Sequence, residues 1–288
     1  MSALPGQTVS SWKETLERVL NLEPEHISAY SLIIEEGTPF YEKYAADARL
    51  REEGEVPHYL PSEEAEREMY CLTEELLLAA GMHRYEISNY AKQGYECRHN
   101  VGYWTGTEYI GFGLGASSYL KHYDVQMLED EEAVKGDNVF GEYSEWPVYA
   151  KEGGPEQITV VRIQNTADME NYLAEDFEHW KEIPKNIAGI LKNQEAYLEM
   201  EFRIEKILAE SLSVEDQMSE FMFLGLRLMD GVSEAEFRHR FRTEIDSVYG
   251  EIIKRQCELG LLKREKGRIF LTKTGIDLSN AVMAEFLL

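Results

Sequence analysis

Hydrophobic residues in the N-terminal part of the chain follow two alternating spacings. After Thr8, a suitable N-cap, apolar residues recur at helical intervals and predict a helix that ends near Leu20. Residues 26–34 are β-rich and almost continuously apolar, as expected for a buried parallel strand. A second amphipathic helix begins after Ser62 and stops at Gly81. This alternation of helix and strand is typical of an α/β fold.

Shorter elements continue the pattern. Residues 35–60 are polar and interrupted by Gly and Pro, which predicts a long loop. Short strands are predicted at residues 84–87 and 108–113. Because the chain starts in a loop just before a helix, a parallel barrel that began here would have too few strands to close. We therefore expect that a barrel strand upstream of Thr8 is missing.

The pattern changes twice in the second half of the chain. Residues 124–212 are acidic and aromatic, and we interpret them as an insertion followed by a helical connector, with helices possible at 168–177 and 188–208. From residue 213 the spacing predicts three helices, a hairpin that turns at Glu265–Gly267 and a closing helix, an order that resembles a winged helix. We therefore expect the chain to divide into three parts, at residues 1–123, 124–212 and 213–288.

Composition narrows the class of protein. The 288 residues include 54 acidic and 29 basic side chains, and the formal net charge is −25. Such a chain repels phosphates, which disfavours nucleic-acid binding. Many of the acidic side chains can simply form a solvated surface. No apolar run is long enough to span a membrane, and no signal peptide is visible. The few, widely spaced cysteines predict a reducing, cytoplasmic location.

Candidate chemistry is concentrated at residues 98–104, which we read as a loop because they have little apolar periodicity. A neutral imidazole can bind haem iron, and tyrosine and tryptophan can stack on a planar macrocycle. The candidate haem-binding residues are His99, Asn100, Tyr103 and Trp104. The alternative is a hydrogen-bonded histidine with aromatic residues that cover the end of the barrel.

Three weaker features each have a structural alternative. Cys97 lies close to His99, but two possible ligands do not make a zinc site. The alternate glycines of residues 111–116 permit close approach to a ligand, or they mark a crowded barrel strand. The predicted hairpin is locally basic, which is typical of DNA-binding winged helices or of a solvated hairpin. Its basic residues are Lys263, Arg264, Lys266, Arg268 and Lys273.

Several segments, taken together and in order, resemble one family. They are LPGQT (4–8), HISAYSLIIEEGTPF (26–40), YEISNYA (85–91), RHNVGYW (98–104), YIGFGLGAS (109–117), EFMFLGLR (220–227) and LTKTGIDLSN (271–280). The family is the radical S-adenosylmethionine (SAM) family of oxygen-independent coproporphyrinogen III oxidase. The motif from His99 to Trp104 is more similar to its haem chaperone branch. Residues 124–157 look like an insertion, Ser117 replaces a frequent histidine, and Cys97 replaces a frequent serine.

The resemblance implies a partial (β/α)6 radical SAM barrel with a helical, winged-helix-like C-terminal domain. Residues 1–123 would be the C-terminal portion of that barrel. In the family, three cysteines spaced C-x3-C-x2-C hold a [4Fe–4S] cluster that binds SAM. The three cysteines of this chain, Cys71, Cys97 and Cys257, lack that spacing. We therefore expect an N-terminally truncated member without the cluster-binding half, to which we assign no catalytic residue and no radical activity of its own.

The resemblance also implies a function in porphyrin or haem metabolism. The expected activity is haem binding and delivery to a recipient haem protein. The alternative, for the intact protein, is oxidative decarboxylation by a true coproporphyrinogen III oxidase. An alternative from another class is nucleic-acid binding through the winged element, which the net charge disfavours.

Overall fold

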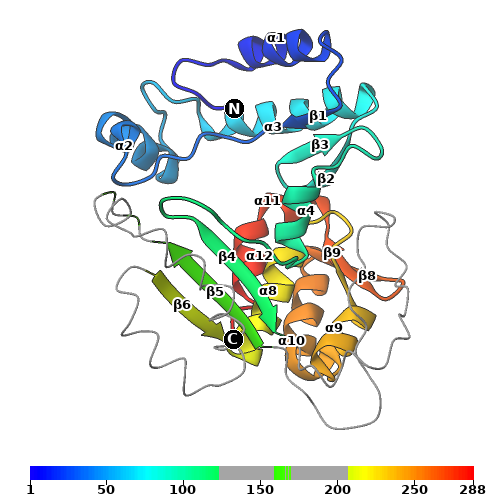
Figure 1. Ribbon diagram of the computed structural model, residues 1–288. Helices are drawn as coiled ribbons and strands as arrows, with labels where there is room; N and C mark the ends of the chain where they lie inside the picture. The colour runs from blue at the N-terminus through cyan, green and yellow to red at the C-terminus, as the bar shows by residue number, and fades with distance from the viewer. Residues whose placement is uncertain (123–158, 166, 168, 170–206) are drawn as a thin grey trace. The chain divides into compact units, whose positions relative to one another are not determined.

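The computed structural model describes residues 1–122, 159–165, 167, 169 and 207–288 (Figure 1). The chain divides into two compact units. The first consists of residues 1–101 with 227–231, and the second of residues 102–226 with 232–288. Each unit combines helices with strands in antiparallel sheets. The fold is therefore mixed α/β, as predicted.

Two helices of the first unit begin where the sequence predicts. α1 (Val9–Leu20) follows Thr8, whose hydroxyl accepts the backbone N–H of Ser11. α3 (Glu63–Ala79) follows Ser62, which caps its helix in the same way. Each cap satisfies a backbone N–H that the first turn leaves without a helical partner. Both predicted helices and their N-caps are confirmed.

The two helices pack together through their apolar faces. Trp12 and Leu16 of α1 form a buried cluster with Met69 of α3. The indole N–H of Trp12 donates to the hydroxyl of Thr73 on α3 at 2.9 Å. This hydrogen bond satisfies the polar atom of a tryptophan that is only 4% exposed. The predicted amphipathic faces are therefore the ones that become buried.

The first unit also contains α2 (Pro39–Glu52), a helix in the segment predicted as a loop. Thr38 accepts the N–H of Tyr41 at 3.2 Å, and proline occupies the first turn, where its missing N–H costs nothing. The helix contains many good helix formers but no apolar stripe, so hydrophobic periodicity does not reveal it. The prediction of a loop across residues 35–60 is wrong for this part.

The sheet of the first unit contains β1 (His26–Ser28), β2 (His83–Glu86) and β3 (Asn89–Ala91) in the order β1-β3-β2. Both pairings are antiparallel. The predicted strand at 84–87 is confirmed as β2. The predicted parallel strand at 26–34 differs from the structure, because β1 ends at Ser28 and pairs antiparallel with β3.

Parallel pairing does occur after the end of β1. Ser2 forms an isolated parallel bridge with Ser31. The backbone N–H of Ser2 donates to the carbonyl of Tyr30 at 2.9 Å, and that of Leu32 donates to the carbonyl of Ser2 at 3.0 Å. The first residues of the chain therefore lie beside this extended segment.

A sheet of the second unit contains β4 (Ser117–His122), β5 (Thr159–Asn165) and β6 (Ile207–Leu212), antiparallel and in sequence order. Most of the predicted connector at 124–212 lies outside the described residues, but β5 and β6 belong to it. Residues 207–208 are strand, not helix. The strand predicted at 108–113 is reduced to a bridge between Tyr109 and Tyr119.

The C-terminal part of the second unit follows the prediction closely. The elements of this part are α8 (Val214–Gly225), β7 (Val232–Ser233), α9 (Glu234–Phe241), α10 (Ile245–Glu258), β8 (Leu262–Glu265), β9 (Arg268–Leu271), α11 (Lys273–Asp277) and α12 (Ser279–Ala284). The three strands form an antiparallel sheet in the order β7-β9-β8, in which β8 and β9 are the predicted hairpin. Ser213 caps α8 in the predicted capping box with Asp216.

Aromatic side chains hold these C-terminal helices together. The ring centroids of Phe221 and Phe237 are 5.5 Å apart, those of Phe237 and Tyr249 are 6.1 Å apart, and those of Tyr249 and Phe286 are 5.3 Å apart. All three pairs have edge-to-face geometry, which favours aromatic contacts. Gly275 permits close packing nearby, because a Cβ there would lie 1.9 Å from the carbonyl oxygen of Leu261.

Within residues 1–122, 159–165, 167, 169 and 207–288, no helix combines the length and the apolar character that a membrane crossing requires.

Candidate functional site

The four candidate haem-binding residues lie on one short helix, α4 (Arg98–Trp104), and not in the loop predicted for this segment. Its residues up to 101 belong to the first unit and those from 102 to the second. His99 and Tyr103 are four positions apart, as are Asn100 and Trp104, and residues at this spacing share a helix face. The helix therefore pairs the histidine with the tyrosine and the asparagine with the tryptophan.

The histidine face of α4 is the more accessible one. His99 is exposed and Tyr103 is 37% exposed, whereas Asn100 and Trp104 are partly buried. The ring of Tyr103 lies edge-on to that of Tyr109, with centroids 4.8 Å apart. Tyr109 in turn stacks on Tyr119 with an interplanar angle of 15°. In the second unit, Tyr103 is therefore the outer member of a row of aromatic rings.

Asn100 faces a different partner. Its side-chain amide donates to the hydroxyl of Tyr85 on β2 at 3.4 Å, and that hydroxyl lies 2.9 Å from Nε2 of His26 on β1. Burial raises the pKa of Tyr85 to about 12, so the phenol stays neutral near pH 7. Burial also lowers the pKa of His26, although the charge of Glu86 opposes the shift. A neutral His26 can accept a hydrogen bond from the phenol O–H. The phenol oxygen is then available to accept the hydrogen bond from the side-chain amide of Asn100.

Glu86 is a second buried polar group of the first unit that sequence reasoning missed. Its carboxylate is fully buried and accepts hydrogen bonds from the backbone N–H of Ser88 and the side-chain amide of Asn89, at 2.7 and 2.5 Å. A guanidinium nitrogen of Arg227 lies 3.9 Å from its other oxygen. The motif YEISN could have indicated it, because an ionisable residue in a buried strand needs such partners. The arrangement fixes the turn between β2 and β3.

Among the described residues, the cysteines belong to no cluster that could hold a metal ion. Cys71 is exposed, Cys97 and Cys257 are partly buried, and all three thiols are free. Among the residues that the structure describes, no group of three or more His, Cys, Asp or Glu side chains could hold a metal ion. Cys97 and His99 therefore gain no third ligand there, and the three cysteines do not fit the ligand set of a [4Fe–4S] cluster.

The glycine-rich segment at residues 111–116 is a loop, and one of its glycines, Gly111, allows close contact within the chain. A Cβ at Gly111 would lie 2.2 Å from the carbonyl oxygen of Ser117. The side-chain amide of Asn165 donates to the carbonyl of Gly113 at 2.8 Å, which ties the loop to β5. This close approach supports the crowded-backbone interpretation for Gly111.

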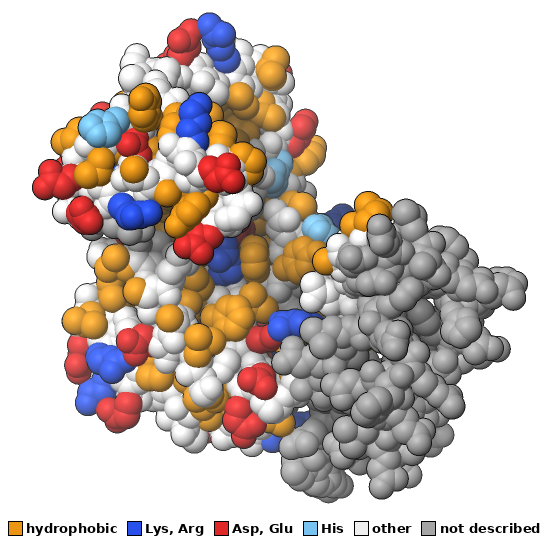
Figure 2. Space-filling view, turned by 90° about the vertical axis from the view of Figure 1, so that its left-hand side faces the viewer, with side chains coloured by type: hydrophobic (Ala, Val, Ile, Leu, Met, Phe, Trp, Pro, Cys, Tyr) orange, Lys and Arg blue, Asp and Glu red, His pale blue; other side chains and the backbone are white. Residues whose placement is uncertain are grey.

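The basic hairpin is partly neutralised. Arg264 forms hydrogen-bonded ion pairs with Glu234 and Asp246, and Lys263 pairs with Glu265 at 2.6 Å. These contacts raise the pKa of Arg264 further above its usual range. Figure 2 presents a face on which acidic and basic side chains are interspersed among hydrophobic ones. The hairpin is therefore less positive than its sequence alone indicates.

Known proteins resemble both the sequence and the fold. A model of the HemN C-terminal domain matches residues 212–278. The haem chaperone HemW of Bacillus subtilis is 29% identical over the whole chain and 57% of its own length. HemW of Lactococcus lactis is 30% identical over 99% of the chain and 56% of its own length. The chain therefore spans about half the length of these relatives.

A solved structure agrees with the sequence matches. Coproporphyrinogen III oxidase (HemN) from Escherichia coli, described as a radical SAM enzyme, superposes with a TM-score of 0.56 over 99% of this chain and 53% of its own, at 16% identity. At this level of identity the likeness concerns the fold alone. The chain belongs to the HemN-like family, and the relatives that match it along its whole length are named haem chaperones.

Proposed function

We propose that this chain carries a haem-binding part of a haem chaperone and that His99 binds the haem iron. The relatives that match the chain along its whole length are named haem chaperones. The observation that supports His99 is its exposure on α4, with the partly exposed ring of Tyr103 one turn further on the same face. An imidazole beside an aromatic ring provides both an iron ligand and a surface for the macrocycle.

The aromatic residues of α4 have different roles in this proposal. Tyr103 contacts Tyr109 by its edge, and its exposed part is available to a planar ligand. Trp104 is partly buried, and its ring centroid lies 6.5 Å from that of Tyr103. We assign Tyr103 to the haem contact and Trp104 to the support of Tyr103.

Asn100 acts on the site indirectly. Its amide donates to Tyr85, so it connects α4 to β2. We therefore assign Asn100 a positioning role, in which it sets the orientation of the helix that presents His99. This role explains how an asparagine that turns away from the exposed face can belong to the same motif as the histidine.

Haem is the cargo in this proposal, and the cluster and SAM belong to the intact family. Because the cysteines of the chain do not fit a [4Fe–4S] cluster, we propose binding and transfer to a recipient haem protein and no radical reaction by this chain alone. We also propose a cytoplasmic location, the C-terminal portion of a (β/α)6 barrel at 1–123, an insertion and connector at 124–212, and a winged-helix-like domain at 213–288.

A haem titration of the full chain, followed by Soret absorbance, tests the function. We expect saturable binding that is lost or strongly weakened in His99→Ala. His58→Ala is the matched control, because His58 is also exposed but lies in the loop before α3. Circular dichroism shows whether each variant is folded. Equal haem affinity in the wild-type chain and a folded His99→Ala would reject His99 as the ligand.

A further inference from the structure

The row of aromatic rings that ends at Tyr103 continues into the interior of the second unit. Tyr109 lies between Tyr103 and Tyr119, and the exposed fraction falls from 37% at Tyr103 to 4% at Tyr119. The backbones of the inner pair, Tyr109 and Tyr119, exchange two hydrogen bonds of 2.9 Å. The ring that we assign to the haem contact therefore rests on rings that are fixed inside the unit.

Tyr119 is held at its hydroxyl by Arg240 of α9. The guanidinium donates a hydrogen bond to the phenol, and burial raises the pKa of Tyr119, so the phenol stays neutral near pH 7. Gly106 marks where the two groups meet, because a Cβ there would lie 3.7 Å from Nη1 of Arg240 and 3.7 Å from the hydroxyl oxygen of Tyr119. The N–H of Gly106 donates to the carbonyl of Tyr103 at 3.2 Å. The contact of Arg240 with Tyr119 therefore lies against the turn that follows Tyr103.

Two further charges surround this contact and, with Arg240, make up a charged cluster (Arg162, Glu220 and Arg240). Glu220 of α8 is 6% exposed and forms an ion pair with Arg162 of β5, which lies opposite Tyr119 in the sheet. Burial raises the pKa of Glu220, and the positive charges of Arg162 and Arg240 oppose this shift. The charges of all three residues act on the hydroxyl of Tyr119. The charged cluster therefore connects α8 and α9 to the sheet of β4 and β5 at this hydroxyl.

The charged cluster is costly to bury. Within the part of the chain that the structure describes, Oε2 of Glu220 and Nη2 of Arg240 are buried and have no hydrogen-bond partner. Buried polar atoms without partners cost free energy, and well-packed apolar side chains often stabilise such a place as well or better. A buried ionic cluster that keeps such atoms calls for an explanation beyond stability.

We propose that Arg240 is a positioning residue of the haem site, which holds Tyr103 through Tyr119 and Tyr109 in the orientation that contacts the macrocycle. This inference rests on the proposed function, and it gives the C-terminal helices a part in haem binding. A guanidinium suits the role because its donors have a fixed, planar geometry, and offset or edge-to-face ring contacts pass a defined orientation along the row. Arg240 acts through the tyrosines and does not contact haem itself.

Haem titration of the full chain, followed by Soret absorbance, tests this role in two backgrounds. Arg240→Met should weaken haem binding about fivefold, as expected for the loss of one hydrogen bond. Tyr119→Phe keeps the stacked ring, removes only the hydroxyl and should have a similar effect. In a Tyr103→Ala chain, Arg240→Met should cause no further loss of haem affinity, because the positioning acts through Tyr103. A purely structural effect of Arg240→Met would weaken binding in both backgrounds.

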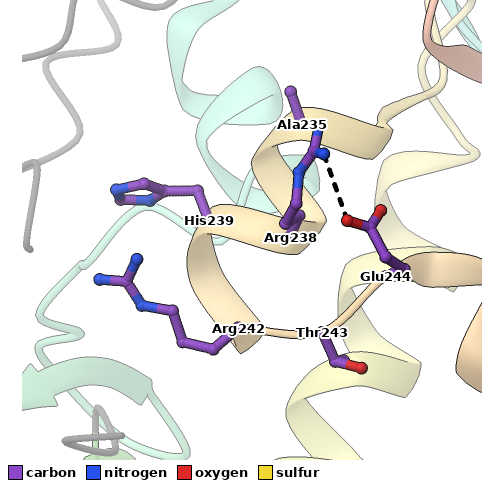
Figure 3. Close-up of a pocket in the computed structure, with 6 residues that line it drawn as sticks. All are labelled: Ala235, Arg238, His239, Arg242, Thr243 and Glu244. Carbon is purple, nitrogen blue, oxygen red and sulfur yellow. Dashed lines mark hydrogen bonds and ion pairs between the residues drawn. The ribbon is translucent and has the colours of Figure 1, made fainter. Parts of the chain in front are cut away.

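Arg238→Met is the matched control, because it makes the same change two positions earlier on α9. Arg238 is exposed, and Figure 3 shows its side chain reaching Glu244, to which it donates a hydrogen bond at 3.2 Å. This variant should bind haem like the wild-type chain. Circular dichroism shows whether each variant is folded.

The possible failures can be told apart. If folded Arg240→Met and Tyr119→Phe bind haem like the wild-type chain while His99→Ala does not, the positioning role is overturned and the proposed function stands. Equal weakening by Arg240→Met with and without the Tyr103 ring would also overturn the positioning role. A folded wild-type chain that binds no haem would overturn the proposed function and this inference with it.

Discussion

The side-chain amide of Asn100 donates a hydrogen bond to the hydroxyl of Tyr85 at 3.4 Å and so connects α4 to β2. The same hydroxyl lies 2.9 Å from Nε2 of His26 on β1. One phenol therefore links two strands of the first unit to the helix that carries His99. Because the phenol is buried, its loss leaves polar atoms without their partner.

The first prediction concerns this phenol. Tyr85→Phe should lower the free energy of unfolding by about 1–3 kcal/mol, because an amide and an imidazole lose a buried partner. Urea denaturation measures the change. Tyr95→Phe is the control, since Tyr95 is 57% exposed and should change stability little. If haem binds as proposed, Tyr85→Phe should also weaken haem binding. Unchanged stability together with unchanged haem affinity would contradict the positioning role of Asn100.

The second prediction concerns Asp47 on α2, which is 3% exposed and accepts the backbone N–H groups of Tyr59 and Leu60 at 2.5 and 2.9 Å. Burial alone would raise the pKa of this carboxyl, but the backbone hydrogen bonds outweigh it and lower the pKa below its ordinary value of 3.8. The ionised group therefore stabilises the fold above about pH 4 and loses this effect as the pH falls through the folded-state pKa.

Asp47→Asn should therefore cost about 1–3 kcal/mol at pH 7, because an amide accepts these two N–H groups less well than a carboxylate. The cost should shrink as the pH falls below 4. Urea denaturation of both proteins at several pH values measures the difference. Glu53→Gln, at an exposed position after α2, is the control and should change the free energy of unfolding little. A pH-independent difference for Asp47→Asn would show that charge is not its source.

The elements that the sequence predicted well are those where several local signals agree. α1, α3 and α8 each have a polar N-cap followed by an apolar stripe, and the hairpin of β8 and β9 has a turn between two apolar runs. When capping, periodicity and turn residues point to one structure, local information is sufficient. α2 was missed because it lacks the stripe, although Thr38 and Pro39 marked its start.

For the candidate site, the sequence supplied candidate residues, which stay predictions, but not how their side chains are arranged. Residue types alone indicated His99 and Tyr103, and the helix places them on one face. The partner of Asn100 could not be predicted, because Tyr85 and His26 reach the same hydrogen-bond network only after β1, β2 and β3 have paired. Similarly, β5 and β6 lie in the connector, for which no strand was predicted, and the pairings of β5 with β4 and with β6 are both long-range.

The third prediction concerns Lys121 at the end of β4, which is only 8% exposed. Burial, together with the charge of Arg240, lowers its pKa from 10.5 to about 7, against the opposing charges of Glu108 and Glu236. The unfolded chain therefore binds more protons than the folded chain between about pH 7 and pH 10.5. Stability should rise with pH across this window as the unfolded chain loses that proton.

Lys121→Met should remove this pH dependence and leave the protein at least as stable at pH 7, because an apolar side chain of similar length avoids the cost of burying a charge. Thermal denaturation at pH 7, 8 and 9 compares the two slopes. This range stays below the pH at which buried tyrosines such as Tyr119 begin to ionise. Parallel slopes in the wild-type chain and the variant would mean that Lys121 does not titrate in this range.

The fourth prediction concerns the left-handed backbone of Arg242. Arg242→Gly should raise the free energy of unfolding by up to about 1 kcal/mol, because glycine adopts a φ of 55° without steric cost. Arg238→Gly makes the same change inside α9 and should lower stability by about 1 kcal/mol, since glycine weakens a helix interior. The exposed pair of Arg238 with Glu244 adds little to this difference. Urea denaturation should therefore give opposite signs for two identical substitutions one turn apart. Destabilisation by both would mean that the contacts of the Arg242 side chain outweigh the strain of its backbone.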